Sequence, residues 1–248
     1  TNLFLTAGGS APAVHSVRVD SQAEGDGEQR PLPASAYAID VDLVNTPGSV
    51  FVYSNPTAQL FEPILLRATG LDAHSYLSQK ILAAIGIDTG DIGLWYDPSG
   101  VNAMTYCCID MRPDDFARFG LLYARGGEWD GEQIVSSEYV EGSLTAQSSN
   151  YGWQWWVLNE NFFGTGVSIS VSAALGLDGQ KIYVWPEADV VLVVLTRYQH
   201  FRNQGYVLAV PDNFPDTCSA RNSCVTSTGP PVASFDQHTL VELMANLR

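Results

Sequence analysis

Apolar residues recur with helical spacing through the first half of the chain. The first periodic segment begins at Asn55, which we expect to cap a helix with Pro56 at its first helical position, and it ends at Gly70. We expect Pro63 to kink this helix. Asp72 is the predicted cap of a second helix, which runs to Ala84. The apolar positions of the first helix are Leu60, Phe61, Ile64, Leu65 and Ala68.

A third helix is predicted after Arg112. Its first turn contains Asp114 and Asp115, which suit the positive end of the helix dipole, and the pair Gly126-Gly127 marks its end. We expect Phe116, Phe119, Leu122 and Tyr123 to form its buried stripe.

The last third of the chain has the patterns of strands. These occur at residues 151–158, 167–173, 181–185 and 190–196, with a turn at 186–189. Residues 203–235 are typical of loops, and residues 236–248 predict a final helix with Leu240, Val241, Leu243 and Met244 inward. Helices followed by an antiparallel sheet and a last helix indicate an α+β fold.

Three regions follow from these patterns. Residues 1–43 are a loop-rich N-terminal segment, residues 44–150 a helical region, and residues 151–248 an antiparallel sheet region with the C-terminal helix. The two later regions are predicted to form one domain.

Charge and hydropathy narrow the range of partners. The 248 residues include 27 acidic and 12 basic ones, a net charge of -15, which repels the phosphates of nucleic acids. No apolar run approaches the roughly 20 residues of a membrane-spanning helix. The scarcity of lysine, with only Lys80 and Lys181, is compatible with a secreted or salt-adapted surface. We expect a secreted or periplasmic protein.

The four cysteines indicate no metal site. Cys107 and Cys108 are adjacent, so we expect them not to bond to each other. Cys218 and Cys224 flank a polar loop, and both alternatives stay open for them: a disulfide that closes the loop, or two free thiols. The sequence has no Cys-x-x-Cys pair, and its four histidines are scattered. No metal or organic cofactor is implied.

Tyr53 stands just before the first predicted helix, two residues from Asn55. A tyrosine with its ordinary pKa near 10 is a poor base at neutral pH, and the positive end of a helix favours the phenolate. Tyr53 is therefore a candidate for proton transfer, or else a packing residue, and Asn55 is a candidate for substrate contact, or else only the helix cap.

These residues carry a resemblance to a known family. PGSVFVYSNPTAQLFEPILLRATG resembles the Tyr-x-Asn segment of the serine β-lactamase and penicillin-binding-protein-like superfamily, closest to class C β-lactamase-like esterases and 6-aminohexanoate-dimer hydrolases. MRPDDFARFGLLYARGGEWDGEQIV resembles the next helix and turn of that family, and LGLDGQKIYVWPEADVVLVVLTR the strand pair with its third motif. The resemblance runs from about residue 44 to residue 196 and implies the β-lactamase/transpeptidase-like fold.

The resemblance implies a role for each matching residue. A Ser-x-x-Lys pair on an upstream helix would supply the nucleophile, and Tyr53 would act as general base and acid. Asn55 would orient the lysine or the substrate carbonyl. The third motif aligns with residues 177–179, so Asp178 and Gly179 would contact substrate and the backbone N–H of Gln180 would donate to the oxyanion.

Two departures change the expected chemistry. The sequence contains no Ser-x-x-Lys, so we expect the N-terminal part of the fold, with this pair, on a segment or companion fragment outside this chain. The third motif has Leu177 where the family has a cation, which favours neutral or cationic esters and amides over β-lactams. The expected function is a serine hydrolase acting through an acyl-enzyme.

Three alternatives stay open. An inactive homologue that binds a ligand or a partner in the same cleft would suit a chain without the nucleophile. Thr1 would be a nucleophile if its free amine activated it. Trp153, Trp155 and Trp156 would either line an acyl pocket or pack against the sheet, and residues of this type in strands favour packing.

Overall fold

The computed structural model describes residues 33–164, 166–176, 179–195, 207–209, 231–233 and 237–247. These residues form two compact units that divide between Met111 and Arg112, and each unit is described here by itself. Asp178 and the pair Cys218 and Cys224 lie outside the described residues, as do 1–32. In the described part of the chain, no helix has both the length and the apolar character needed to cross a membrane.

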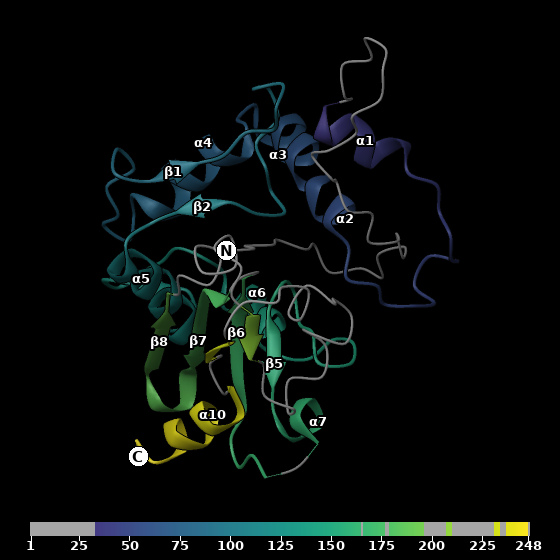
Figure 1. The fold of residues 1–248 in the computed structure, drawn as a ribbon. Coiled ribbons are helices and arrows are strands. Elements are labelled where there is room, and N and C mark those ends of the chain that lie inside the picture. Colours follow the sequence, from purple (N-terminus) through teal and green to yellow (C-terminus); the bar gives the residue numbers. More distant parts are fainter. Residues whose placement is uncertain are drawn as a thin grey trace. The chain divides into compact units, whose positions relative to one another are not determined.

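The first unit consists of short helices and one small β-ribbon (Figure 1). Its helices are α1 (Ala34–Asp40), α2 (Asn55–Gln59), α3 (Phe61–Thr69) and α4 (Ala73–Leu77), the last continuing as the π-helix η1 (Ser78–Leu82). Strands β1 (Gly93–Leu94) and β2 (Ile109–Asp110) pair antiparallel, with Leu94 opposite Ile109. Asp72 caps α4 as predicted, accepting hydrogen bonds from the N–H groups of His74 and Ser75.

The helix predicted from Asn55 to Gly70 is divided into α2 and α3 at Leu60. Pro63 explains this position, because it has no N–H to donate to the carbonyl of Gln59 and its ring crowds that carbonyl. None of the apolar positions predicted for this helix is fully buried: Leu60, Phe61 and Leu65 are partly buried, and Ile64 is 56% exposed. Glu62, in contrast, is buried. Gly70 ends α3 with a left-handed φ of 74°.

Cys107 and Cys108 form a disulfide, so the expectation that adjacent cysteines would not bond is wrong. The backbone accommodates the bond because Cys108 adopts a φ of 84°, in the left-handed region that residues other than glycine rarely occupy. Both cysteines are partly exposed.

The second unit contains the main sheet. Strands β5 (Trp156–Leu158), β6 (Val171–Leu175), β7 (Lys181–Trp185) and β8 (Val190–Val194) lie in that order, each antiparallel to its neighbour. The turn η3 (Pro186–Ala188) joins β7 to β8, as predicted. The other elements are α5 (Pro113–Ala124), the hairpin β3 (Glu128–Trp129) and β4 (Glu132–Gln133), α6 (Ser137–Leu144), α7 (Glu160–Phe163), the parallel pair β9 (Val207–Ala209) and β10 (Pro231–Ala233), and α10 (Gln237–Ala245).

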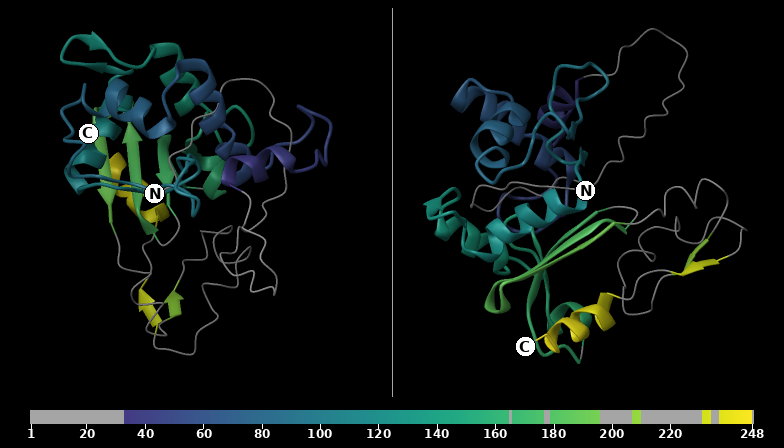
Figure 2. Two further views of the ribbon diagram at one scale, coloured as in Figure 1. Left: turned by 90° about the horizontal axis from the view of Figure 1, so that it is seen from above. Right: turned by 90° about the vertical axis from the view of Figure 1, so that its left-hand side faces the viewer.

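Helices cover both faces of this sheet, and Figure 2 shows α5 and α10 on opposite sides of it. Helix α5 packs on β7 and β8, and its predicted stripe of Phe116, Phe119, Leu122 and Tyr123 is buried. The approach is so close at Gly120 that an added Cβ would lie 2.6 Å from Val191 and 2.9 Å from Ile182. The sequence analysis placed α5 and α6 with the helical region, and in the structure both belong to the unit that contains the sheet.

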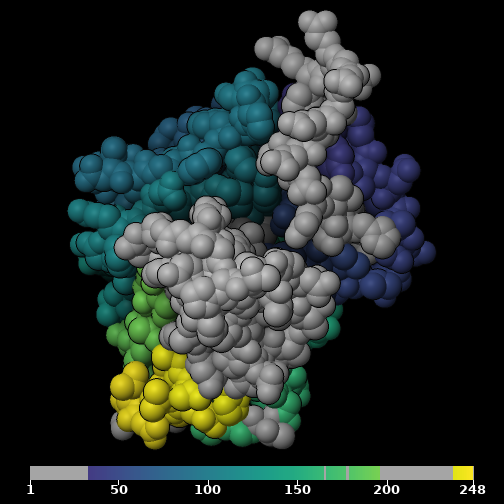
Figure 3. All heavy atoms as spheres, in the orientation of Figure 1, coloured from purple at the N-terminus to yellow at the C-terminus, as the bar shows by residue number. Residues whose placement is uncertain are grey.

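Helix α10 covers the other face of the sheet. Val241 and Met244 are buried in a cluster with Tyr183 and Trp185 of β7. Figure 3 shows α10 at the molecular surface, and Leu243, which we expected to face inward, is 57% exposed. The described residues thus have the predicted α+β architecture, an antiparallel sheet flanked by helices.

Candidate active site

Tyr53 and Asn55 lie at the start of α2. The cap of this helix is Ser54 and not Asn55, because Ser54 has extended backbone angles and its Oγ accepts a hydrogen bond of 3.2 Å from the N–H of Thr57. Asn55 is the first residue of the helix, followed by Pro56. The side chains of Tyr53 and Asn55 are both half-buried. Ser54 therefore caps the helix in place of Asn55, the predicted cap. The Asn55 amide is not used for capping.

Buried hydrogen bonds fix α2 to residues 103–105. Nε2 of Gln59 donates to the carbonyl of Ala103 at 2.9 Å, and Oε1 of Gln59 accepts from the N–H of Thr105 at 3.2 Å. The hydroxyl of Thr105 donates to the carbonyl of Ala58 at 2.8 Å. Gln59 is only 2% exposed and its bond to Ala103 is buried, while the two bonds of Thr105 are partly buried. Together they hold the helix that follows Tyr53 in place.

The same glutamine connects α2 to α1 and α3. Its Nε2 also donates to Oγ of Ser35 at 3.1 Å, and the Ser35 hydroxyl donates to Oε2 of Glu62 at 2.9 Å. The sequence analysis missed Gln59, Ser35 and Glu62. No local pattern identifies them, since polar residues in short amphipathic helices are ordinarily exposed.

Tyr106 is a half-buried tyrosine that directly follows Thr105 of this anchor. Burial first, and then the charge of Asp97, raise the pKa of its phenol. Tyr106 therefore keeps its proton at neutral pH and is suited to donate a hydrogen bond, not to accept a proton.

Gly179 and Gln180 lie between β6 and β7. The carbonyl of Gln180 accepts a 2.7 Å hydrogen bond from the N–H of Gly176, and the N–H of Gly179 donates to the carbonyl of Gly176 at 3.2 Å. Gly179 has a φ of 97°, and an added Cβ at Gly176 would lie 2.6 Å from Cγ of Gln180. The connection therefore needs glycine at both positions, and it presents Gln180 at the beginning of β7.

Lys181 is the residue after Gln180 and faces the other side of the sheet, because side chains alternate along a strand. Its side chain is buried, and this burial lowers its pKa to about 8. Along β7, Lys181 shares a face with Tyr183 and Trp185, the face that α10 covers.

The candidate residues divide between the two units. The helical unit contains Tyr53 and Asn55, and the sheet unit contains Gly179 and Gln180. The structure brings together the members of each pair, and the contact between the two pairs stays a prediction.

Histidines and acidic residues form no metal site in the described ranges, since no group of three His, Cys, Asp or Glu side chains there is placed to hold an ion. His74 is buried, and its Nε2 donates to the carbonyl of Trp95 at 2.6 Å. Nδ1 of His238 lies 3.6 Å from Oε2 of Glu242. His15 and His200 lie outside the described residues.

The three tryptophans near β5 pack within the second unit. Trp155 is buried and lies against Phe119 and Tyr123 of α5, with ring centroids 6.4 and 4.8 Å apart. Trp153 covers Gly142 of α6, where an added Cβ would lie 2.4 Å from its ring. These contacts agree with the packing alternative for Trp155 and Trp153, and a role in an acyl pocket stays a prediction.

The structure was compared with known proteins. No protein-family model matches the sequence, and no curated protein matches it. A solved structure provisionally named a 6-aminohexanoate-dimer hydrolase, from Bacillus anthracis, is 22% identical and gives a TM-score of 0.56 over 74% of this chain. Another, provisionally named a β-lactamase, from Bacteroides dorei DSM 17855, is 18% identical and gives a TM-score of 0.51 over 64% of this chain. This chain has the β-lactamase-like fold.

The β-lactamase/transpeptidase-like fold that the sequence resemblance implied is therefore confirmed. The match covers 48% of the first of these proteins and 53% of the second, so the chain spans about half the length of each. In the β-lactamase-like fold of this chain, α5 and α10 enclose the sheet whose β6–β7 connection contains Gly179 and Gln180.

Proposed function

We propose that this chain is part of a serine hydrolase that cleaves ester or amide bonds through an acyl-enzyme. The observation that carries the proposal is the β-lactamase-like fold together with the position of Tyr53, immediately before the capped and anchored helix α2. The structural neighbours named above have names of hydrolytic enzymes, which supports the same reaction class.

Each candidate residue has a separate task. Tyr53 takes the proton of the serine hydroxyl as the serine attacks the carbonyl, and it returns the proton to the leaving group. Asn55 orients the substrate carbonyl. The backbone N–H of Gln180 donates to the developing oxyanion, with Asp178 and Gly179 beside it. The nucleophilic serine and its lysine come from a segment outside this chain, either a companion fragment or another part of a longer protein.

The third motif suggests the substrate class. Leu177 stands at its first position and Asp178 at its second, so the motif offers no positive charge to a substrate carboxylate. We therefore expect neutral or cationic esters and amides to react faster than β-lactams. Hydrolysis of a neutral short-chain ester by the native material should exceed that of a β-lactam, and the reverse preference would overturn this assignment.

A binding module without catalysis is the second candidate. The absence of a Ser-x-x-Lys sequence from this chain favours it. Such a protein would bind a ligand or a partner in the cleft where a hydrolase would bind its substrate.

One experiment separates the two readings. Native material is purified, its intact masses and N-termini are determined, and it is treated with a serine-reactive phosphonate. A companion segment that carries the label on a Ser-x-x-Lys serine supports the hydrolase. A protein that consists of this chain alone and takes up no label supports the binding module. A secreted or periplasmic fraction is the material to test first, because the Cys107–Cys108 disulfide suits an oxidising compartment.

Tyr53 can be tested in the active material. Tyr53→Phe should lower kcat by about 10²- to 10⁴-fold, since it removes the general base and acid, and should change KM little. Tyr96→Phe is the matched control, because Tyr96 lies in the same unit, is 41% exposed, and makes only a 3.4 Å hydrogen bond to Asp72. Equal rates for the two variants would exclude Tyr53 from proton transfer.

A further inference from the structure

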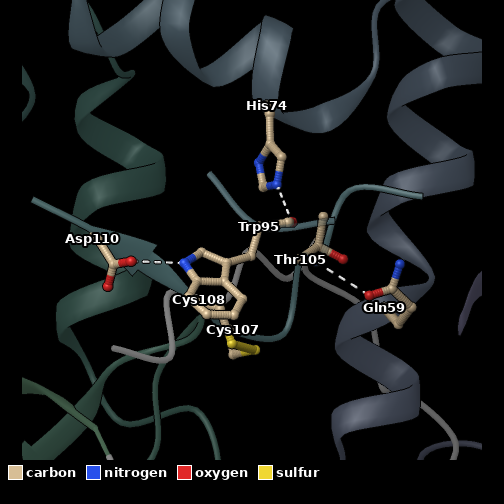
Figure 4. Close-up of a disulfide and its surroundings, with 7 residues drawn as sticks. All are labelled: Gln59, His74, Trp95, Thr105, Cys107, Cys108 and Asp110. Atoms are coloured by element: carbon tan, nitrogen blue, oxygen red, sulfur yellow. Dashed lines mark hydrogen bonds between the residues drawn. A yellow bond between two sulfur atoms is a disulfide. The ribbon is translucent and has the colours of Figure 1, made fainter. Parts of the chain in front are cut away.

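The Cys107–Cys108 disulfide lies between two anchored parts of the first unit (Figure 4). On one side, Thr105 is bonded to Gln59 and to the carbonyl of Ala58 in α2. On the other side, β2 begins directly after Cys108 and pairs with β1. The cysteine pair therefore lies in the chain between the residues that hydrogen-bond to α2 and the second strand of the β-ribbon.

The backbone of Cys108 depends on this bond. A disulfide between adjacent residues closes a small ring that includes the peptide between them, and here Cys108 has a φ of 84°. A residue with a side chain is disfavoured in this region unless its surroundings hold it there. Breaking the sulfur–sulfur bond opens the ring and removes this restraint.

Trp95 is directly connected to the conformation of Cys108. Its N–H donates to the carbonyl of Cys108 at 3.3 Å, and its carbonyl accepts from the N–H of Met104 at 3.0 Å and from Nε2 of His74 at 2.6 Å. Its indole N–H donates to Oδ2 of Asp110 at 2.7 Å. Rotation of the Cys108 backbone out of the left-handed region therefore takes away one of the hydrogen bonds that hold Trp95.

The pair is reachable, and space exists for its rearrangement. Both cysteines are partly exposed, so a small thiol can approach the sulfur atoms. Cys107 also lines an apolar cavity of about 50 Å³, together with His74, Leu77 and Ile109. A close-packed interior would resist a change of backbone conformation, whereas a cavity beside Cys107 admits one.

We propose that Cys107–Cys108 is a reversible thiol–disulfide site, and that its reduction by a dithiol frees the Cys108 backbone and loosens the β1–β2 ribbon at Trp95. One thiolate of the dithiol attacks a cysteine sulfur and forms a mixed disulfide, and the second thiol displaces the protein sulfur. The protein disulfide takes up two electrons and two protons, and the dithiol leaves as a cyclic disulfide. Oxidation by a disulfide of low molecular weight reverses the exchange.

The test treats the folded protein with dithiothreitol and follows three readouts: alkylation of the cysteines, amide hydrogen exchange, and tryptophan emission, which should change on reduction because Trp95 is hydrogen-bonded to Cys108. Alkylation with iodoacetamide and peptide mapping should show label on both Cys107 and Cys108 without denaturant, and treatment with oxidised glutathione before alkylation should abolish it. Amide hydrogen exchange in the peptides that contain Trp95 and Cys108 should accelerate on the order of tenfold on reduction. Exchange in α5 (Pro113–Ala124) should not change.

Two variants identify the source of the signal. Cys107→Ser/Cys108→Ser keeps Cys218 and Cys224, so any response of these two cysteines to dithiothreitol persists in it, while the change near Trp95 should be absent. Trp95→Phe should abolish the change in tryptophan emission that accompanies reduction of the wild-type protein. A disulfide that is reduced only after denaturation, or one whose reduction leaves exchange near Trp95 unchanged, would overturn the proposal. None of the three readouts needs hydrolysis, so a failure here is distinguishable from failure of the proposed hydrolase function.

Discussion

Replacing Gln59 by leucine should destabilise the first unit far more than the same replacement of an exposed glutamine would. The substitution removes the partners of two backbone groups, the carbonyl of Ala103 and the N–H of Thr105. A buried polar group left without a partner costs about 1–3 kcal/mol. Because water can reach Thr105 in part, we expect the free energy of unfolding to fall by about 2–4 kcal/mol.

Gln133→Leu is the matched control. Nε2 of Gln133 donates to two backbone carbonyls, those of Gly126 and Val135, at 2.8 and 2.6 Å, but this side chain is exposed. Water replaces the lost donor there, so the expected cost is below about 1 kcal/mol.

Urea unfolding and thermal unfolding of the two variants and the wild type would give both costs. At about 4–8 °C per kcal/mol for a unit of this size, Gln59→Leu should lower Tm by roughly 10 °C or more. Equal decreases in the free energy of unfolding for Gln59→Leu and Gln133→Leu would show that burial of the Gln59 network adds nothing to stability. They would also show that the hydrogen bonds of Gln59 do not hold α2.

Two further predictions concern the sheet unit. Burial lowers the pKa of Lys181 from 10.5 to about 8, so the unfolded state binds this proton more tightly than the folded state. The free energy of unfolding should therefore rise with pH between 8 and 10.5, by about 3 kcal/mol in total. Lys181→Met should abolish this rise and stabilise the protein at pH 7, as measured by urea unfolding across that range, and an unchanged pH dependence would contradict the assignment. Tyr183→Phe should cost about 1–2 kcal/mol in the same assay, because the Tyr183 hydroxyl donates to Oε1 of Gln237 at 2.9 Å inside the core. A loss as small as that of the exposed Tyr96→Phe would refute it.

Elements with a long or regular pattern were predictable from the sequence. The stripe of α5 fits helical spacing over about two turns. Strand β8 is a continuous run of apolar residues, β7 is apolar after Lys181, and a proline-containing turn lies between them. In each case the local pattern and the tertiary packing favour the same structure, so reading the pattern alone was sufficient.

Features decided by one or two residues were not predictable. Ser54 and Asn55 are both good caps, and only the backbone angles distinguish them. Leu243 fits the apolar pattern of α10 but points away from the sheet, since the helix buries only the narrow face that contains Val241 and Met244. The Cys107–Cys108 bond depends on a left-handed backbone at Cys108, which no sequence pattern encodes.

The candidate site could be predicted only in its parts. The Tyr-x-Asn sequence identified the start of α2, and the third motif identified the connection between β6 and β7. The anchor formed by Gln59 and Thr105 could not be foreseen, because its two residues are 46 positions apart and neither belongs to a motif.

The order of the elements along the chain has a consequence for synthesis on the ribosome. All four strands of the sheet leave the exit tunnel before α10, whose Val241 and Met244 complete the cluster around Tyr183 and Trp185. Until then, one apolar face of the nascent sheet has no helix over it and is open to wrong association or to chaperones. Ribosomes stalled before residue 237 should therefore hold a chain with this face uncovered, and release of the last helix should be the step that closes it.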